Sequence, residues 1–154
     1  MAEARKSWSG AYTCMFNDDL SEMLLLWRNK EKREKEIVGW GNIGGSMEPG
    51  ETALQTCIRE AKEEIGIELK PEDLTFICTK ASPGEAPHSW TIYFYAASID
   101  GNTEINLNDE SRGYAWFGAN ELPAGTLDSK EDILNWWSLA KNALHKGDKI
   151  NLQD

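Results

Sequence analysis

Short apolar runs separated by polar stretches are the main pattern in the first third of the chain. Residues 11–16 (AYTCMF) and residues 23–27 (MLLLW) are the clearest runs, and each predicts a buried β-strand. The next segment, residues 28–36, alternates in charge and has no apolar face, so we expect a solvated loop or an exposed hairpin. A further short strand is expected over residues 37–43, although two glycines interrupt it.

The apolar positions then change to a helical period. Thr52 and Gln55 match the capping-box pattern of a helix start, and Gly66 is a natural helix end. Between them one apolar stripe recurs at steps of four, three and four residues: Leu54, Ile58, Ala61 and Ile65. We therefore predict a helix between residues 52 and 66 whose apolar side packs on the core.

The second half of the chain alternates between strands and a helix. Strands are predicted over residues 74–80, 89–98 and 114–117, and an amphipathic helix over residues 129–145. The expected core contacts of this helix are Ile133, Leu134, Trp137, Ala140 and Leu144. Of its two adjacent tryptophans, we expect one in the core and one at its boundary. The mixed order of strands and helices predicts an α/β protein with a mixed sheet between helical layers.

Length, composition and charge narrow the function classes. A chain of 154 residues without an internal repeat or long linker predicts one domain, residues 1–154. The net charge of −10 argues against a nucleic-acid backbone as the main partner, and no apolar run is long enough to cross a membrane. The three cysteines lack C-x-x-C spacing and the first residues lack the apolar stretch of a signal peptide. We therefore expect reduced cysteines in a cytoplasmic protein.

Three glutamates crowd one turn of the predicted helix: Glu60, Glu63 and Glu64. Like charges at this spacing repel each other, so a positive partner is expected beside them. The glutamates lie mostly away from the apolar stripe, which leaves that side of the helix to a ligand. Carboxylates without histidine or cysteine suit a hard cation such as Mg²⁺ better than zinc. Arg59 is placed to pair with Glu51 and to hold the preceding loop against the helix.

Residues 45–67 resemble the Nudix box, in which a glycine, a glutamate and an Arg-Glu…Glu-Glu cluster recur at fixed spacing. The matching positions here are Gly45, Glu51, Arg59, Glu60, Glu63, Glu64, Gly66 and Ile67, with Ala61 in an aliphatic slot. A merely solvated acidic helix explains neither this register nor the glycines. The resemblance implies an α/β/α sandwich and Mg²⁺- or Mn²⁺-dependent hydrolysis of a nucleoside diphosphate that is linked to a further group.

The resemblance also implies roles for single residues. The implied metal ligands are Glu60, Glu63, Glu64 and a backbone carbonyl of the Gly44–Gly45 pair. The implied supporting shell is Glu51 and Arg59, with Arg59 also counted among the catalytic candidates. The general base varies among relatives, and the candidates here are Glu60, Glu63 and Glu110. The segment around Glu110 is interpreted equally well as a polar loop without a catalytic role.

Substrate recognition has three candidate residues in the sequence. Trp27 and Trp40 are candidates for a base pocket, although plain core packing accounts for each of them as well. Pro83 follows the end of the box, Ile67, at a spacing that is similar to that of a proline in the ADP-ribose-cleaving branch of the family. We therefore expect a substrate of the ADP-ribose or nucleotide-sugar type. The alternatives are a nucleoside triphosphate pyrophosphatase of the housecleaning type and a non-catalytic nucleotide-binding module.

The sequence departs from the family pattern at one position beside the box. Many relatives have a proline immediately before the glycine pair, whereas this chain has Ile43. The change leaves the acidic positions intact but alters the expected pocket wall. The substrate of this chain is therefore harder to infer from the substrates of the family. The expected partner is a small-molecule nucleotide, while capped RNA as a substrate and a homodimer stay open.

Overall fold

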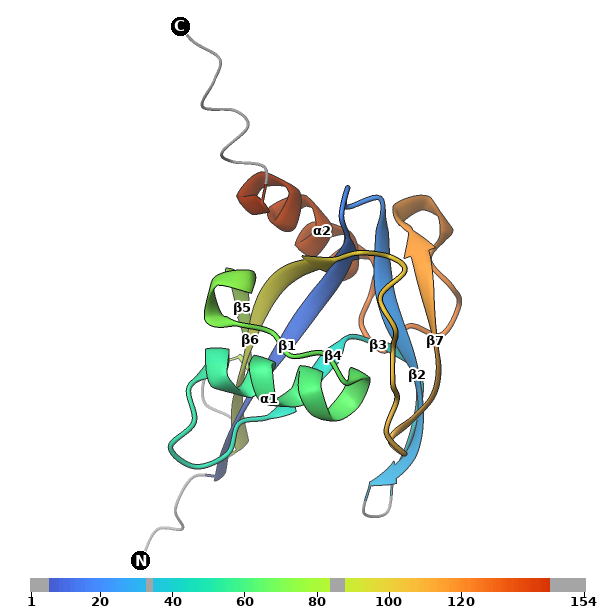
Figure 1. Ribbon diagram of the computed structural model, residues 1–154. Helices are drawn as coiled ribbons and strands as arrows, with labels where there is room; N and C mark the ends of the chain where they lie inside the picture. Colours follow the sequence, from blue (N-terminus) through green and yellow to red (C-terminus); the bar gives the residue numbers. More distant parts are fainter. Residues whose placement is uncertain (1–5, 33–34, 84–87, 145–154) are drawn as a thin grey trace, which may run out of the picture.

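The computed structural model describes residues 6–32, 35–83 and 88–144, which Figure 1 shows as one sheet flanked by helices. Within these residues the sheet has seven strands in the order β3-β2-β1-β6-β5, with β4 paired to β1 and β7 paired to β2. The strands are β1 (Lys6–Asn17), β2 (Glu22–Lys32), β3 (Lys35–Gly41), β4 (Ile43–Ser46), β5 (Thr75–Ala81), β6 (His88–Ile99) and β7 (Ser111–Gly118). The helices are α1 (Ala53–Ile65) and α2 (Lys130–Leu144), with short 3-10 turns η1 (Pro71–Asp73) and η2 (Ala119–Glu121). Both ends of the predicted domain, residues 1–5 and 145–154, lie outside the described part.

The two helices pack on opposite faces of the sheet. Leu24 and Leu26 of β2 belong to the core beneath α1, whereas Met23 and Leu25 belong to the core beneath α2. This division follows from the alternation of side chains along a strand. β1 and β6 are parallel, and the other strand pairs are antiparallel. A mixed sheet between two helical layers confirms the predicted fold class.

The chain passes from one strand pair to another at Asn42. The charged segment after the apolar run of β2 forms a hairpin with β3, which is one of the two arrangements expected. β3 ends at Gly41 and β4 begins at Ile43, so the single strand predicted over residues 37–43 is wrong. The reason is a change of partner, because β3 pairs with β2 whereas β4 pairs with β1.

Both ends of α1 follow the sequence prediction. The Gln55 N–H donates to Thr52 Oγ1 at 3.1 Å, and the Thr52 N–H donates to Gln55 Oε1 at 2.9 Å, which is a complete capping box. Gly66 ends the helix in the left-handed conformation, with φ of 72°. These caps fix where α1 begins and ends relative to β4, the strand that carries the glycine pair (Figure 1).

The buried face of α2 differs from the prediction. Both tryptophans are buried, so the expectation of one at the boundary is wrong. Trp136 stacks on Phe94 with ring centroids 4.1 Å apart, and Trp137 donates its indole N–H to the Leu20 carbonyl at 2.8 Å. Leu134, expected in the core, is exposed. Neither helix in the described ranges is long and apolar enough to cross a membrane.

Candidate active site

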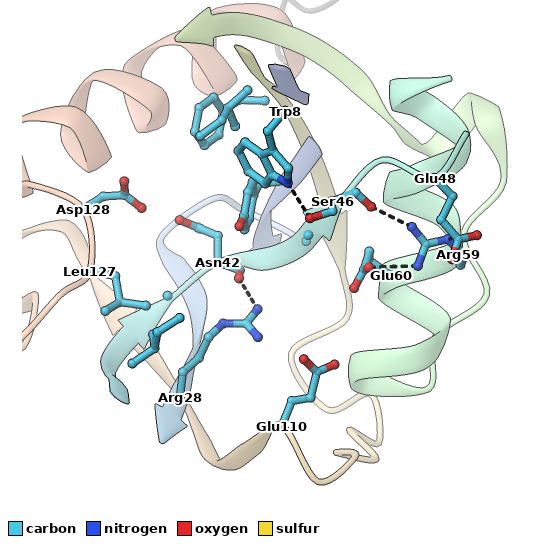
Figure 2. A pocket seen from close by; sticks show the side chains of 17 residues that line it. Trp8, Arg28, Asn42, Ser46, Glu48, Arg59, Glu60, Glu110, Leu127 and Asp128 are labelled. Atoms are coloured by element: carbon cyan, nitrogen blue, oxygen red, sulfur yellow. Dashed lines mark hydrogen bonds and ion pairs between the residues drawn. The ribbon is translucent and has the colours of Figure 1, made fainter. Parts of the chain in front are cut away.

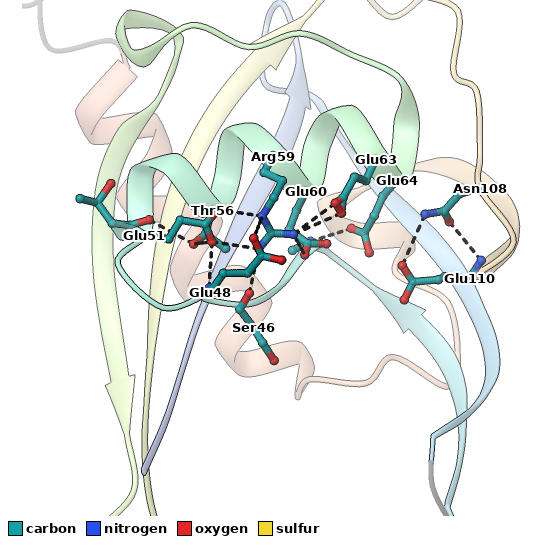
Figure 3. A network of polar contacts seen from close by, with 12 residues as sticks. Ser46, Glu48, Glu51, Thr56, Arg59, Glu60, Glu63, Glu64, Asn108 and Glu110 are labelled. Atoms are coloured by element: carbon teal, nitrogen blue, oxygen red, sulfur yellow. Dashed lines mark hydrogen bonds and ion pairs between the residues drawn. The ribbon is translucent and has the colours of Figure 1, made fainter.

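One arginine of α1 is surrounded by carboxylates. Arg59 binds Glu51 twice, through Nε to Oε2 at 2.7 Å and through Nη2 to Oε1 at 2.9 Å (Figure 3). Its Nη1 donates to Glu60 Oε2 at 2.9 Å and to Glu63 Oε1 at 3.2 Å. Its Nη2 also donates to the Ser46 carbonyl at 2.9 Å. Arg59 is thus a positive partner of the crowded glutamates, and it ties the preceding loop to the helix.

Glu51 is held by several donors at once. Besides Arg59, the Thr56 hydroxyl donates to Glu51 Oε1 at 2.6 Å and the Glu48 N–H donates to the same oxygen at 3.0 Å. The hydrogen bond from Arg59 lowers the pKa of Glu51 to about 2. Glu51 is therefore ionised at neutral pH and keeps the loop docked on the first turns of α1.

Glu64 is almost completely buried, with 1% of the residue exposed. Its two carboxylate oxygens accept hydrogen bonds from Arg28, Oε2 from Nη1 at 2.9 Å and Oε1 from Nη2 at 3.1 Å. The Gly44 N–H donates to Oε1 as well, at 2.8 Å, and Arg28 Nη2 also donates to the Asn42 carbonyl at 2.6 Å. Burial raises the pKa of Glu64, and Arg28 opposes that rise. A second arginine, Arg28 of β2, thus neutralises part of the negative charge of the cluster from the buried side of α1.

The predicted orientation of the glutamates is wrong for two of the three. Glu60 and Glu64 lie on the buried side of α1 together with Cys57 and Ala61, whereas Glu63 has 48% of its side chain exposed. Residues three and four positions apart share one face of a helix, so these four buried positions form one row. The apolar stripe predicted from the sequence shares only Ala61 with this row. The prediction considered apolar residues alone and therefore did not include the two carboxylates in the buried row.

Arg28 is the main site residue that the sequence analysis missed. The charge pattern assigns it to a solvated segment, yet only 5% of it is exposed. Leu24 and Leu26 face α1, so the alternation along β2 places Arg28 on that same side. The sequence did contain a signal for this residue. β2 extends past the end of its apolar run, so the alternation of side chains along the strand, continued beyond Trp27, would have predicted that Arg28 faces α1.

Glu60 lies between Arg59 and the buried pair. Burial, followed by the nearby charge of Glu64, raises the pKa of Glu60 to about 7. Gly45 packs against this carboxyl group, and a Cβ at residue 45 would come within 2.8 Å of Glu60 Oε2. Any side chain at residue 45 would shift this carboxyl group, so the glycine leaves room for Glu60 in its present position.

Glu110 reaches the cluster from a different element, the turn that precedes β7 (Figure 3). Its N–H donates to Asn108 Oδ1 at 3.0 Å, and Asn108 Nδ2 donates to its Oε2 at 3.4 Å. The charge of Glu110 acts on the pKa values of both Arg28 and Glu64, which places it near the buried pair. The structure therefore brings the later acid chosen from the sequence to the carboxylate helix.

A cavity of about 590 Å³ opens beside the carboxylates (Figure 2). Its charged part is lined by Arg28, Glu48, Arg59, Glu60 and Glu110, with the backbone of Gly44 and Gly45. The rest of the lining is mainly aromatic and aliphatic, and includes Trp8, Tyr12, Ile37, Ile92, Phe94 and Leu127, with the polar side chains of Asn42 and Asp128. Burial raises the pKa of Asp128. No local pattern pointed to Asp128, because only the fold brings the loop before α2 to β3, where the Trp40 N–H donates to the Gly125 carbonyl and the Leu127 N–H donates to the Trp40 carbonyl.

The substrate-binding candidates taken from the sequence lie elsewhere. Trp27 and Trp40 pack edge to face with ring centroids 5.3 Å apart, and Trp40 packs in the same way on Phe117 at 5.0 Å. Pro83 is exposed and lies just after the end of β5. None of the three candidates is among the residues that line the cavity. The structure thus does not bring them to the carboxylate cluster.

The donor set of the site fits a hard divalent cation. It consists of carboxylates and of backbone near the Gly44 position, all of them oxygen donors. As the side chains lie, no three histidine, cysteine, aspartate or glutamate residues of the described ranges are grouped to hold a metal ion. The contacts explain this, since each helix glutamate already faces a guanidinium. Burial, together with the nearby charge of Glu64, raises the pKa of Glu60, and a cation beside this carboxyl group would favour its ionised form.

Sequence comparison connects the chain to known proteins. The family model described as the NUDIX domain matches residues 7–137. Human 8-oxo-dGDP phosphatase NUDT18 is 31% identical over 140 residues, which are 88% of this chain and 40% of that protein. The nucleoside triphosphatase NudI of Salmonella schwarzengrund (strain CVM19633) is 33% identical over 90 residues, 54% of this chain and 64% of that protein. The chain thus spans less than two thirds of the length of either relative.

Structure comparison agrees at the level of the fold. The crystal structure of a MutT NUDIX hydrolase from Burkholderia pseudomallei superimposes with a TM-score of 0.67 at 22% identity, over 84% of this chain and 97% of that one. The family match extends from β1 through the carboxylate helix to α2, and so includes every element that lines the cavity. On these grounds the chain belongs to the Nudix family.

Proposed function

We propose that this protein hydrolyses a phosphoanhydride bond in a nucleoside di- or triphosphate. The observation that carries the proposal is a single cavity lined both by the carboxylates Glu60 and Glu110 and by aromatic and aliphatic side chains. Such a cavity suits a phosphate chain at one part and a base at the other. Family membership supports the reaction type, and the names of the two relatives, an 8-oxo-dGDP phosphatase and a nucleoside triphosphatase, support this substrate class.

Each charged residue of the cluster has a separate task in this proposal. The residues that we propose as ligands of Mg²⁺ or Mn²⁺ are those that the family resemblance implies: Glu60, Glu63, Glu64 and, through its carbonyl, Gly44. A bound divalent ion supplies neutralisation of phosphate charge and lowers the pKa of a bound water. Arg59 and Glu51 keep the glycine-bearing loop against α1, and Arg28 orients the Glu64 carboxyl group by binding both of its oxygens.

Glu60 is the proton acceptor that we propose. It lines the cavity, and so it lies within reach of a water molecule beside the phosphate chain, as a general base has to. The oxygen of water attacks one phosphorus atom, its proton passes to Glu60, and the phosphoanhydride P–O bond breaks. Glu110, which lines the cavity from another element, is the second candidate. Glu63 is less suited because it is half exposed and outside the lining.

This proposal differs from the substrate class that the sequence favoured. The expectation of ADP-ribose or a nucleotide sugar depended on Pro83, which is exposed and outside the cavity lining. The alternative of a nucleoside triphosphate pyrophosphatase has gained the support of the relatives. A module that binds nucleotides without cleaving them would not need a proton acceptor beside the phosphate part of the cavity.

A substrate panel tests the proposal. Product release is measured for nucleoside di- and triphosphates, including oxidised purines, and for ADP-ribose, nucleotide sugars, dinucleoside polyphosphates and capped RNA, with Mg²⁺ or Mn²⁺ and with a chelator. We expect a nucleoside di- or triphosphate to have the highest kcat/KM and the chelator to abolish turnover. Faster cleavage of ADP-ribose would restore the substrate class expected from the sequence. Tight nucleotide binding without product from any compound would identify a binding module.

A further inference from the structure

We propose that Trp8 is the surface on which the nucleobase of the substrate stacks, and that Gly10 and Ser46 hold its indole in place. We call these three residues the stacking platform. The inference rests on the proposed function, because it assigns a residue to the base in the same cavity. It is distinct from the sequence expectation, which looked for this role in Trp27 and Trp40.

Trp8 combines exposure with a place in the cavity lining. It lies on β1, 37% of it is exposed, and its ring borders the cavity in Figure 2. A large indole left partly open to a cavity retains apolar surface that a flat ring can cover. Trp27 and Trp40 offer no such surface to the cavity, since they pack against each other outside its lining.

Gly10 provides the space on which the indole lies. A Cβ at residue 10 would come within 2.6 Å of Cη2 and 2.9 Å of Cζ2 of Trp8. Contacts this short require the ring to move, so even an alanine at residue 10 would displace the indole. The glycine is therefore needed for the position of Trp8 and not only for the strand.

Ser46 fixes the indole from the neighbouring strand. It stands directly opposite Gly10 in the β1–β4 ladder, and its Oγ accepts a hydrogen bond from Trp8 Nε1 at 2.5 Å. The indole thus reaches across the glycine to the next strand. With its one polar atom bonded at the ring edge, the indole is held in a single orientation.

The platform is also connected to the carboxylate cluster. The Ser46 carbonyl accepts a hydrogen bond from Arg59 Nη2 at 2.9 Å, and Arg59 in turn binds Glu51 and Glu60. One residue therefore positions the indole through its side chain and the charged helix through its backbone. A base on Trp8 would be held at a fixed distance from the proton acceptor, as a precise site requires.

The surroundings of Trp8 suit a heteroaromatic ring. Ile92 and Phe94 supply apolar lining, and in the parallel β1–β6 register Ile92 lies beside Gly10. Asn42 and Asp128 supply hydrogen-bonding side chains to the same cavity (Figure 2). A flat ring with polar groups at its edge, which describes a nucleobase, satisfies both kinds of lining.

The test replaces Trp8 and a matched tryptophan, Trp90, which faces Trp8 in the β1–β6 register but does not line the cavity. For the best nucleotide of the panel we expect Trp8→Ala to raise KM about tenfold, as the loss of base stacking does, with kcat nearly unchanged. The inhibition constant of inorganic pyrophosphate, which has no base, should not change. Trp90→Phe should leave both constants as in the wild type.

Two further variants keep the test decisive if Trp8→Ala does not fold. Trp8→Phe keeps an aromatic face but loses the bond to Ser46, and should raise KM by a smaller factor. Gly10→Ala leaves Trp8 in the sequence but displaces its ring, and should raise KM as Trp8→Ala does. An unchanged nucleotide KM in Trp8→Phe and Gly10→Ala, or an equal rise in the pyrophosphate inhibition constant, would overturn the proposal.

Failure of the proposed function can be told apart from failure of the platform. If the wild-type protein cleaves no nucleotide, binding of a non-hydrolysable nucleoside diphosphate is followed by tryptophan fluorescence. Quenching that disappears in Trp8→Phe and persists in Trp90→Phe supports the platform even then. Quenching that persists in Trp8→Phe contradicts it.

Discussion

The two arginines that balance the carboxylate cluster do so in different surroundings. Arg28 is buried and binds one carboxylate, Glu64, whereas Arg59 has 23% of its side chain exposed and binds Glu51, Glu60 and Glu63. Breaking an ion pair in a dry environment leaves a buried charge without a partner, whereas a pair near water is screened. We therefore expect Arg28 to hold α1 on the sheet and Arg59 to exchange carboxylate partners more easily than Arg28 does.

The largest effect is expected from breaking the dry pair. Arg28→Met should lower the free energy of unfolding by about 3–5 kcal/mol, because Glu64 remains buried without its counter-ion. Urea denaturation at neutral pH measures the loss. The matched control is the double variant Arg28→Met/Glu64→Met, which should recover much of it. A single variant as stable as the wild type would show that Arg28 is not needed to hold the helix.

The next largest effect concerns catalysis. Glu60→Gln removes the proposed proton acceptor while keeping the size of the side chain, and should lower kcat about 10²- to 10⁴-fold. Initial rates with saturating nucleotide and Mg²⁺ measure this loss, and Glu110→Gln is the comparison. If Glu110→Gln loses far more activity than Glu60→Gln, the proton acceptor is Glu110.

The same substitution sharpens the comparison through pH. The pKa of Glu60 is raised from 4.5 to about 7 on folding, so the folded protein holds this proton more tightly than the unfolded chain. The stabilisation is complete below pH 4.5 and is lost as pH rises through 7. In chelator, the melting temperature of the wild type should therefore decline from pH 5 to pH 8 more steeply than that of Glu60→Gln. Equal slopes would contradict the raised pKa.

A smaller effect is expected at Glu51, the partner that Arg59 binds twice. Glu51→Gln should cost about 1.5 kcal/mol, as loss of a charged hydrogen-bond acceptor does. Because Arg59 lowers the pKa of Glu51 from 4.5 to about 2, its stabilisation is present above pH 4.5 and is lost as pH falls toward 2. Melting temperatures between pH 5 and pH 2.5 should fall less steeply in Glu51→Gln than in the wild type. An unaltered acid profile would argue against this pair.

The smallest effect on stability is expected at Glu63. Its contact with Arg59 is half exposed, so Glu63→Gln should change the free energy of unfolding by less than about 0.5 kcal/mol. Its turnover should nevertheless fall by orders of magnitude if Glu63 holds the divalent ion. Glu68→Gln, which breaks an exposed pair with Lys62, is the control and should change neither quantity. Full activity in Glu63→Gln would remove this residue from the metal ligands.

Most elements of the fold could be predicted from patterns among residues that are close in the sequence. The capping box at Thr52 and the end of α1 at Gly66 were predictable because they involve residues close in sequence. The pairing of Arg59 with Glu51 was predictable for the same reason, since a loop and the helix after it bring them together. The positions of β1, β2, β5, β6 and β7 followed from their apolar runs, although the predicted ends differ from the observed ones, whereas the division into β3 and β4 was not predicted.

Contacts between distant segments were not predictable in this way. Arg28 meets Glu64 only because β2 and α1 face each other, and the charges around Arg28 hid the alternation that would have revealed its direction. Trp8 resembles several other tryptophans in sequence, and only a glycine and a serine on adjacent strands distinguish it. Asp128 gave no signal, because its place depends on the pairing of the preceding loop with Trp40 of β3.

The position of Arg59 has a consequence for ion binding. A guanidinium attached to the same helix as Glu60 and Glu63 acts as a tethered competitor at high effective concentration. If Glu60 and Glu63 hold a divalent ion as proposed, the ion has to displace Arg59, and its affinity is expected to depend on how readily Arg59 can retreat to Glu51. Under that proposal, ion binding would be sensitive to the concentration of free divalent ions, because the guanidinium competes for the same carboxylates.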